Sequence, residues 1–174
     1  MRIARTLLLS LSLTACLGGG TSTPLIGAAR AGDGAAVRSL VAHGASPNET
    51  GGVNGWTPLE HAVHKNQLES VKALLDAGAD PNLADRAGTT PLIMAAGYGY
   101  TPIVELLLRR GADPRRFNRN GQNALDAALS GTSDIDRFTL LDCQTSTVAT
   151  LRHADPSLSP RASGQMASWA KKCG

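Results

Sequence analysis

Two stretches of this chain are copies of one pattern and decide its fold. Residues 56–59 read Trp-Thr-Pro-Leu and lead to Gly-Ala-Asp-Pro-Asn at 78–82. Residues 89–92 read Thr-Thr-Pro-Leu and lead to Gly-Ala-Asp-Pro at 111–114. The two copies are 33 residues apart, which predicts a structural unit of that length that is repeated along the chain.

The opening of each copy predicts the start of a helix. Thr57 and Thr90 precede a proline and can act as N-caps, since a threonine hydroxyl accepts a hydrogen bond from a free N–H of the first turn. Pro58 and Pro91 then occupy the first helical position, where a missing N–H costs nothing. Glu60 lies three residues after Thr57, which predicts a capping box.

A turn and a second helix follow in each copy. Asn66 and Gly99 stand at the turn, and both residue types tolerate positive φ. Gly78 and Gly111 are expected to end the second helix in the left-handed conformation. The apolar residues of that helix fall at i, i+3 and i+4 and so form one stripe: Val71, Leu74 and Leu75, or Val104, Leu107 and Leu108. One helix pair cannot bury such a stripe alone, so about three or more stacked copies are required.

Residues at equivalent positions of the repeat, which we call columns, continue the pattern upstream and downstream of the two copies. The spacing between equivalent residues is 34, 33 and 33, with the extra residue in the loop 48–55. Three columns carry this periodicity: Leu25, Leu59, Leu92 and Leu125; Ala28, Ala62, Ala95 and Ala128; and Leu40, Leu74, Leu107 and Leu140. We therefore predict four repeats, at about 23–55, 56–88, 89–121 and 122–143, with the outer two acting as caps.

A 33-residue unit that opens with Thr-Pro-Leu and closes with Gly-Ala-Asp-Pro resembles the ankyrin repeat. The resemblance implies an all-α solenoid of about four helix-turn-helix repeats with short inter-repeat β-turn fingers, and a binding scaffold rather than a catalyst. One departure concerns the histidine that follows Thr-Pro-Leu in that family. At the equivalent position, the four repeats of this chain have Ile26, Glu60, Ile93 and Asp126, so the hydrogen bonds of that histidine are absent or replaced.

The end of the chain departs from the repeat. The fourth copy decays after Cys143, where Gln144 stands in place of the glycine. We interpret residues 144–174 as a C-terminal capping extension over the fourth repeat. A separate partner-binding tail is the alternative interpretation.

The first residues are typical of an export signal. Arg2 and Arg5 form a positive region before a short apolar stretch, which predicts a signal peptide at residues 1–15. The sequence Leu13-Thr14-Ala15-Cys16 resembles a bacterial lipobox, which implies lipidation of Cys16 and, with Leu17 following, attachment to the outer membrane on the periplasmic side. Residues 16–22 would be the lipidated N-terminus and a glycine-rich linker. The alternative is an ordinary signal peptide with an incidental cysteine.

The other two cysteines fit an exported protein. If Cys16 carries lipid, Cys143 and Cys173 remain, which is the right number for one disulfide. Their bond would fold the extension back onto the stack. Two free thiols in a cytosolic protein are the alternative.

Composition and motifs argue against several function classes. Without Arg2 and Arg5 the chain has 15 basic against 14 acidic residues, and aromatics are 3% of it, so no nucleic-acid partner is predicted. The histidines show no metal-ligand spacing, and His61 and His64, three residues apart, are interpreted as part of a solvated helix face. We therefore expect a monomer that is not an enzyme and has no cofactor, no metal and no small-molecule substrate.

These observations predict a protein partner but do not identify it. Exported bacterial ankyrin proteins of this size resemble inhibitors or immunity proteins that cover a periplasmic toxin or enzyme. They also resemble adaptors or stress-related scaffolds that hold an envelope partner, and a structural envelope lipoprotein is a third reading. We favour the inhibitor.

The binding face follows from the resemblance, because ankyrin partners usually contact the fingers and the exposed side of each first helix. Aromatic and arginine side chains are the ones that interface hot spots favour. We predict a site centred on Tyr98, with Trp56 alternatively packed against the neighbouring finger. Mapped by column, the predicted partner-binding residues are Val53, Asn54, Trp56, His64, Lys65, Arg86, Thr89, Tyr98, Tyr100, Arg119, Asn120 and Gln122.

Overall fold

The computed structural model describes residues 23–51, 54–130, 144–161 and Lys171. Over these residues the chain is helical and has no strand beyond one isolated bridge, between Gly51 and Trp56. The predicted all-α class is therefore confirmed. The helices are α1 (Pro24–Ala31), α2 (Gly34–Ala42), α3 (Pro58–His64), α4 (Leu68–Asp76), α5 (Pro91–Tyr98), α6 (Thr101–Arg109), α7 (Ala124–Ser130) and α8 (Thr145–Ala154).

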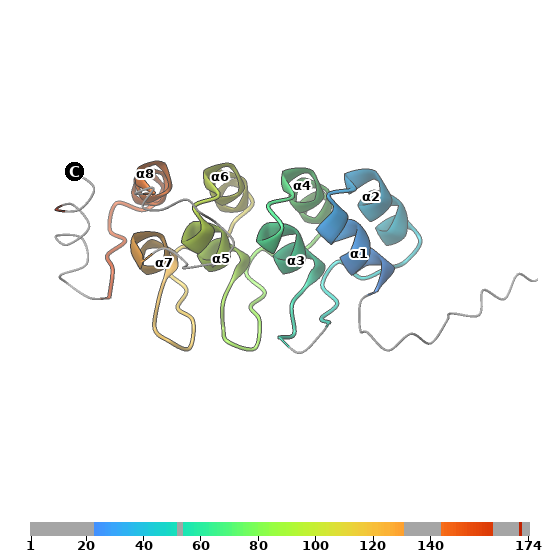
Figure 1. Cartoon of the computed structure of the whole chain (residues 1–174), viewed down its shortest axis with the longest axis horizontal. Coiled ribbons are helices and arrows are strands. Elements are labelled where there is room, and N and C mark those ends of the chain that lie inside the picture. The colour runs from blue at the N-terminus through green and yellow to red at the C-terminus, as the bar shows by residue number, and fades with distance from the viewer. Residues whose placement is uncertain (1–22, 52–53, 131–143, 162–170, 172–174) are drawn as a thin grey trace, which may run out of the picture.

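The helices form two parallel layers (Figure 1). The first layer holds α1, α3, α5 and α7, and the second holds α2, α4, α6 and α8. Each helix packs against the next one in its own layer and against its partner in the other. Long hairpin loops leave the helices and project beside the first layer, and we call them fingers: the first at 44–57, the second at 78–90 and the third at 111–123.

The helix starts and turns are those that the sequence predicts. The hydroxyls of Thr57 and Thr90 accept hydrogen bonds from the third backbone N–H of their helices at 3.2 Å. Glu60 completes the capping box, since the N–H of Thr57 donates to its carboxylate at 2.8 Å. At the turns Asn66 has φ 57° and Gly99 has φ 71°. Local chemistry therefore sets the length of each helix.

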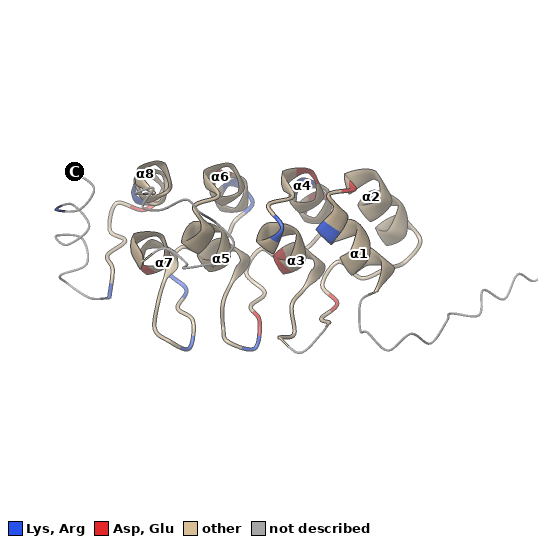
Figure 2. Ribbon diagram, viewed as in Figure 1, with Lys and Arg blue, Asp and Glu red and all other residues tan. Residues whose placement is uncertain are grey.

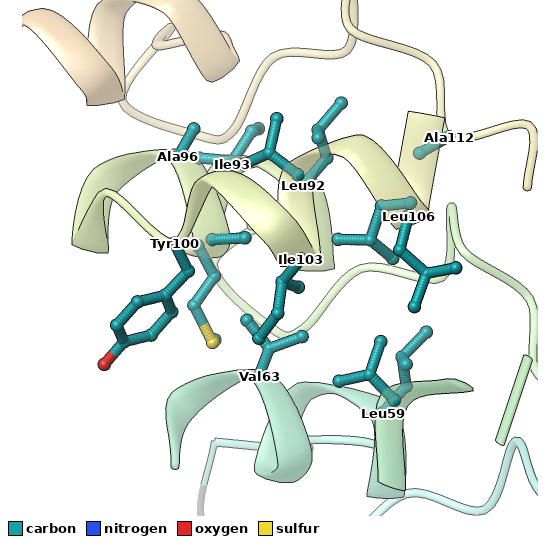
Figure 3. Packing of buried hydrophobic residues seen from close by; sticks show 14 of the residues in the cluster. Leu59, Val63, Leu92, Ile93, Ala96, Tyr100, Ile103, Leu106 and Ala112 are labelled. Atoms are coloured by element: carbon teal, nitrogen blue, oxygen red, sulfur yellow. The ribbon is translucent and has the colours of Figure 1, made fainter. Parts of the chain in front are cut away.

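The predicted leucine column is the centre of the core. Leu25, Leu59, Leu92 and Leu125 are each at most 1% exposed, so this column is buried in all four units. A valine column in the second layer is buried with it, at Val37, Val71, Val104 and Val148. Figure 3 shows Leu59 and Val63 of α3 pointing toward the next helix pair, which contributes Ile103 and Leu106. The core is thus shared between units rather than enclosed by any one of them.

Backbone hydrogen bonds close the fingers and connect them. Within each finger an N–H donates across the hairpin: Gly51 to Trp56, Asp85 to Thr89 and Asn118 to Gln122, at 3.0 Å in all three. Between fingers, the N–H of Arg86 donates to the carbonyl of Asn54 at 3.2 Å, and that of Arg119 donates to Ala87 at 2.9 Å. The fingers therefore form one hydrogen-bonded row along the stack.

Asparagine side chains bridge successive units at the base of the fingers. The amide of Asn48 donates to the carbonyl of Gly78 and accepts from the N–H of Asp80. The amide of Asn82 does the same with Gly111 and Asp113, at 2.9 and 2.8 Å. Each bridge joins an asparagine side chain of one finger to the backbone at the start of the next finger.

The fourth unit differs from the sequence prediction in its second helix. A constant 33-residue spacing places that helix before Cys143, in residues that are not among those described. In the structure α8, from the segment interpreted as an extension, packs against α6 and α7 in the second layer. Val148 and Leu151 follow Val104 and Leu107 by 44 residues and are buried like them.

Gln144 explains the position of α8. It stands at the N-cap of α8, and its amide donates to the carbonyl of Gly97 and packs against Gly99. Gln67 at the N-cap of α4 packs against Gly32 in the same way. Both helices carry the pattern Gln-x-x-Ser/Thr-Val-x-x-Leu, at 67–74 and 144–151, so the pattern rather than the spacing marks the start of this helix.

The residues after α8 cover the end of the stack. Arg115, which stands where Asn82 stands one unit earlier, donates from Nε to the carboxylate of Asp155 at 2.5 Å. This arginine, together with the Ser157 hydroxyl, holds the pKa of Asp155 well below its usual range. Asn123 donates to the carbonyl of Ser159, and the N–H of Arg161 donates to Asp126. Residues 155–161 thus contact the third finger and α7 at the end of the stack.

Several predicted features lie outside the described residues. They are the signal peptide at 1–15, Cys16, Val53, and the disulfide between Cys143 and Cys173. No helix within the described ranges is long and apolar enough to span a bilayer.

If α8 is the second helix of the fourth unit, a cavity made beside α8 must lower the free energy of unfolding as much as a cavity elsewhere in the core does. We expect Leu151→Ala to lower the free energy of unfolding by about 2–5 kcal/mol, the range for a buried leucine. Chemical denaturation monitored by circular dichroism measures this difference.

The neighbouring Arg152→Ala is the matched control, because Arg152 is exposed on the same helix. It is expected to change stability by no more than about 0.5 kcal/mol. Equal, small effects of both changes would mean that α8 is an accessory tail.

Candidate protein-binding face

The fingers and the first-layer helices hold the residues predicted to contact a partner. The structure leaves five of them exposed: Asn54, Lys65, Arg86, Arg119 and Asn120. Five others are half-buried: Trp56, His64, Thr89, Tyr98 and Gln122. The predicted set therefore combines exposed cationic and amide side chains with a partly buried group of rings.

The rings of the second and third repeats form a continuous line, which we call the aromatic row. Trp56 lies 5.3 Å from His61 and 5.0 Å from His64, measured between ring centroids. His64 lies 5.7 Å from Tyr98, and Tyr98 stacks on Tyr100 at 5.4 Å. The hydroxyl of Tyr98 is 3.0 Å from Nδ1 of His64, so one hydrogen bond joins the two repeats. Such a row is rigid, because each ring limits the rotation of the next.

Trp56 also connects two fingers. Its indole Nε1–H donates to the carboxylate of Asp85 at 3.2 Å. The other oxygen of Asp85 accepts from the backbone N–H of Ala87 and of Thr89, each at 2.8 Å. The interpretation that Trp56 packs against the neighbouring finger thus describes the structure. Its half-buried ring still contributes to the surface of the row.

Two expectations about individual side chains need correction. Tyr100 is among the predicted partner-binding residues, but it is only 7% exposed and belongs to the core cluster. It stands at the N-cap of α6, and Tyr98 covers its ring. His61 and His64 were interpreted as a solvated face, yet both are half-buried against Trp56. Trp56 of the same repeat covers both, Tyr98 of the next repeat also contacts His64, and spacing within one helix reveals neither contact.

The third finger contains an exposed aromatic residue that the sequence analysis missed. Phe117 is 56% exposed, more than any other large hydrophobic side chain in the described part of the chain. Arg116 and Arg119 flank it and are exposed as well. The signal was present in the sequence, since an aromatic residue between arginines in a loop is typical of an interface anchor.

A buried carboxyl, Glu60, lies in the first turn of α3. Glu60 is 0% exposed, and its Oε1 has no hydrogen-bond partner in the structure. Burial, and less strongly the negative charge of Asp85, raise its pKa to about 7. Burial also lowers the pKa of His61, as does the charge of Arg30. The second repeat therefore carries groups that stay neutral where free side chains would be charged.

The rings of this face contact one another. Within the described ranges, no three or more His, Cys, Asp or Glu side chains lie together as a metal site would require. The histidines of the aromatic row are engaged by neighbouring rings. What the face offers a partner is partly exposed ring area together with exposed arginine and asparagine side chains.

Two family models match the sequence, and together they cover most of it. A model of three ankyrin repeats matches residues 3–85, and a model of many ankyrin repeats matches residues 74–128. The chain contains ankyrin repeats. The family is generally non-catalytic, and its repeats bind other proteins. The chain is accordingly a protein–protein interaction module.

Relatives share the repeats over short stretches. The 2-5A-dependent ribonuclease of Mus musculus is 41% identical over 71 residues, which are 41% of this chain and 10% of the ribonuclease. The putative ankyrin repeat protein YahD of Escherichia coli is 41% identical over 70 residues, which are 37% of this chain and 34% of YahD. The NF-kappa-B inhibitor alpha of Sus scrofa is 54% identical over 43 residues, which are 25% of this chain and 14% of the inhibitor. The chain thus spans about a third or less of the length of these relatives.

The raised pKa of Glu60 has a consequence for stability. The unfolded side chain loses its proton above its ordinary value of 4.5, whereas the folded one keeps it up to about pH 7. As pH rises through this interval, the unfolded state is therefore increasingly favoured, by up to about 3 kcal/mol in all. Glu60→Gln keeps an acceptor for Thr57 and removes the titration.

We expect the variant to gain stability relative to the wild type between about pH 5 and about pH 8. Urea unfolding at the two pH values measures the change. Glu69→Gln, which alters an exposed acid on α4, is the control. An unchanged pH dependence in Glu60→Gln would contradict the assignment of a neutral buried carboxyl.

Proposed function

We propose that this stack binds a protein of the bacterial periplasm and inhibits or neutralises it. The observation that supports the proposal best is the aromatic row, a rigid and partly exposed set of rings that runs from Trp56 at the end of the first finger to Tyr98 at the end of α5. Rigid rings lose little conformational entropy when a partner covers them, so they bind tightly for their area. The exposed Arg86 and Arg119 border the same face and add charged contacts.

An inhibitory role fits a surface that covers its partner and supplies no chemistry of its own. One relative, the NF-kappa-B inhibitor alpha, is an inhibitor by its name. An envelope scaffold or adaptor would use the same surface, and the effect on the partner's activity separates the two. We therefore design the test to capture the partner first and to measure its activity second.

We further propose that the mature protein is attached through lipid on Cys16 to the periplasmic side of the outer membrane. The support is the positive and apolar start of the chain, followed by Leu13-Thr14-Ala15-Cys16. Several acyl chains on one residue give a stable anchor, because each buried CH₂ contributes about 0.8 kcal/mol. The glycine-rich residues 18–20 would keep the repeats close to the membrane.

The binding face is tested with the mature protein on a resin and an extract of the envelope. We expect one protein to be retained, and its activity to fall when the free stack is added. Tyr98→Ala combined with Arg86→Ala is expected to weaken binding by about 2 kcal/mol or more. Isothermal titration with the purified partner measures the loss.

Two controls accompany this test. Lys72→Ala with Glu105→Ala alters exposed residues of the second layer and should leave affinity unchanged. Tyr98→Phe keeps the stacking on Tyr100 and reports whether a loss of packing causes the effect. If the second-layer pair abolishes binding while the first pair does not, the partner uses the opposite face. If the partner is retained but its activity is unchanged, the protein is a scaffold.

The anchor is tested by Cys16→Ser. Without the thiol no lipid can be attached, so the variant should stay unprocessed and leave the detergent phase in a Triton X-114 partition. A serine variant that partitions like the wild type would exclude lipidation at this residue.

A further inference from the structure

The charge of the fingers changes sign along the stack. The first finger carries one glutamate, and the second carries two aspartates and one arginine. The third carries one aspartate and three arginines. Figure 2 shows this change, with acidic segments in the finger before α3 and basic ones in the finger before α7. The end of the finger row near α7 is therefore basic, and its start is acidic.

Three arginines, two in fingers and one in the segment after α8, each lie against a glycine of the preceding finger. The side chain of Arg86 lies against Gly55, that of Arg119 lies against Gly88, and that of Arg161 lies directly against Gly121. Each glycine has φ between 69° and 75°, and its missing Cβ leaves the space that the arginine fills. Arg161 belongs to the segment after α8, so this segment continues the row of arginines beyond the last finger.

Not every arginine of the third finger is available to a partner. Arg115 is bound to Asp155 and Ser157. Arg116 and Arg119 are exposed on either side of Phe117, which is 56% exposed. Cations around one apolar ring match a partner that presents carboxylates around an apolar contact.

We propose that the third finger and the adjoining Arg161 bind an acidic segment of a partner protein, with one apolar side chain of that segment packed on Phe117. This inference rests on the proposed function and names the chemistry of the partner. We call the surface the basic finger surface; it consists of Arg116, Phe117, Arg119 and Arg161. Asn118 replaces the finger aspartate Asp85 at the equivalent position, so the hairpin keeps its turn hydrogen bonds without a negative charge.

The charge pattern favours a compact acidic site over an extended anion. A nucleic acid strand or an anionic membrane that reached along the row would meet Glu49, Asp80 and Asp85 on the first two fingers. Repulsion there opposes the attraction at the third finger. An acidic protein segment that ends at the third finger avoids this repulsion.

The test uses the mature full chain and a fluorescein-labelled short peptide of glutamates with one central leucine. We expect saturable binding that weakens with added salt, since the contacts are charged. Arg116→Glu with Arg119→Glu should weaken this binding about tenfold or more. Phe117→Ser should weaken binding of this peptide and leave unchanged the weaker binding of a peptide in which serine replaces the leucine.

The matched control is Arg109→Glu with Arg152→Glu, which makes the same change in net charge at exposed second-layer positions. It should leave peptide binding within about twofold of the wild type. Circular dichroism of both pairs checks that the stack is folded. Equal losses in the two pairs, or none in either, would overturn the proposal.

Vesicles of anionic phospholipid and a single-stranded oligonucleotide are run beside the peptide. Tighter binding of either one, lost in the third-finger pair, would assign the surface to that ligand and overturn the acidic-protein inference. With the captured partner, loss through the aromatic-row variants alone would overturn this inference and keep the proposed function. If the chain binds the peptide but captures no protein from the envelope, the proposed function is overturned and the inference about acidic segments is kept.

Discussion

Burial of one apolar seam between neighbouring helix pairs is the interaction on which the rest of this structure depends. The leucine column of the first layer and the valine column of the second are buried only because the next unit covers them. A single pair cannot bury its apolar surface alone, so its stability depends on its neighbours. The fingers, the aromatic row and the end segment are all positioned by this stacking. Any change that separates two units therefore alters the surface as well as the core.

Hydrogen bonds set the register that the apolar seam alone would leave open. The amides of Asn48 and Asn82 join successive fingers at their bases, and backbone N–H groups join them further out. His64 and Tyr98 add a bond between first-layer helices. These contacts are polar and directional, so they fix the distances between rings and cations on different units. A binding surface assembled from several repeats requires that precision.

The sequence predicts most of this fold because its signals are local. The Thr-Pro start, the turn at Asn66 or Gly99 and the glycine helix ends each act within a few residues, and the structure confirms them. The second helix of the fourth unit was misplaced, because a constant period was assumed where eleven more residues intervene. The burial of Tyr100 and the histidines does not follow from helical spacing, since it depends on ring contacts with Tyr98 and Trp56. Phe117 stands where the earlier fingers have no aromatic residue, so the repeat pattern does not mark it.

The contact between Arg115 and Asp155 bears on how a chain like this one can grow. At the two earlier junctions an asparagine amide offers one donor and one acceptor, so any unit with the same glycine and aspartate can follow. A gene duplication that inserts a whole unit there would meet a compatible neighbour on both sides. Arg115 has donors only and is matched to one aspartate that follows α8. Units can therefore be added in the middle of the stack, where an asparagine bridges to the next unit. After the third finger Arg115 replaces that asparagine and cannot form the same bridge.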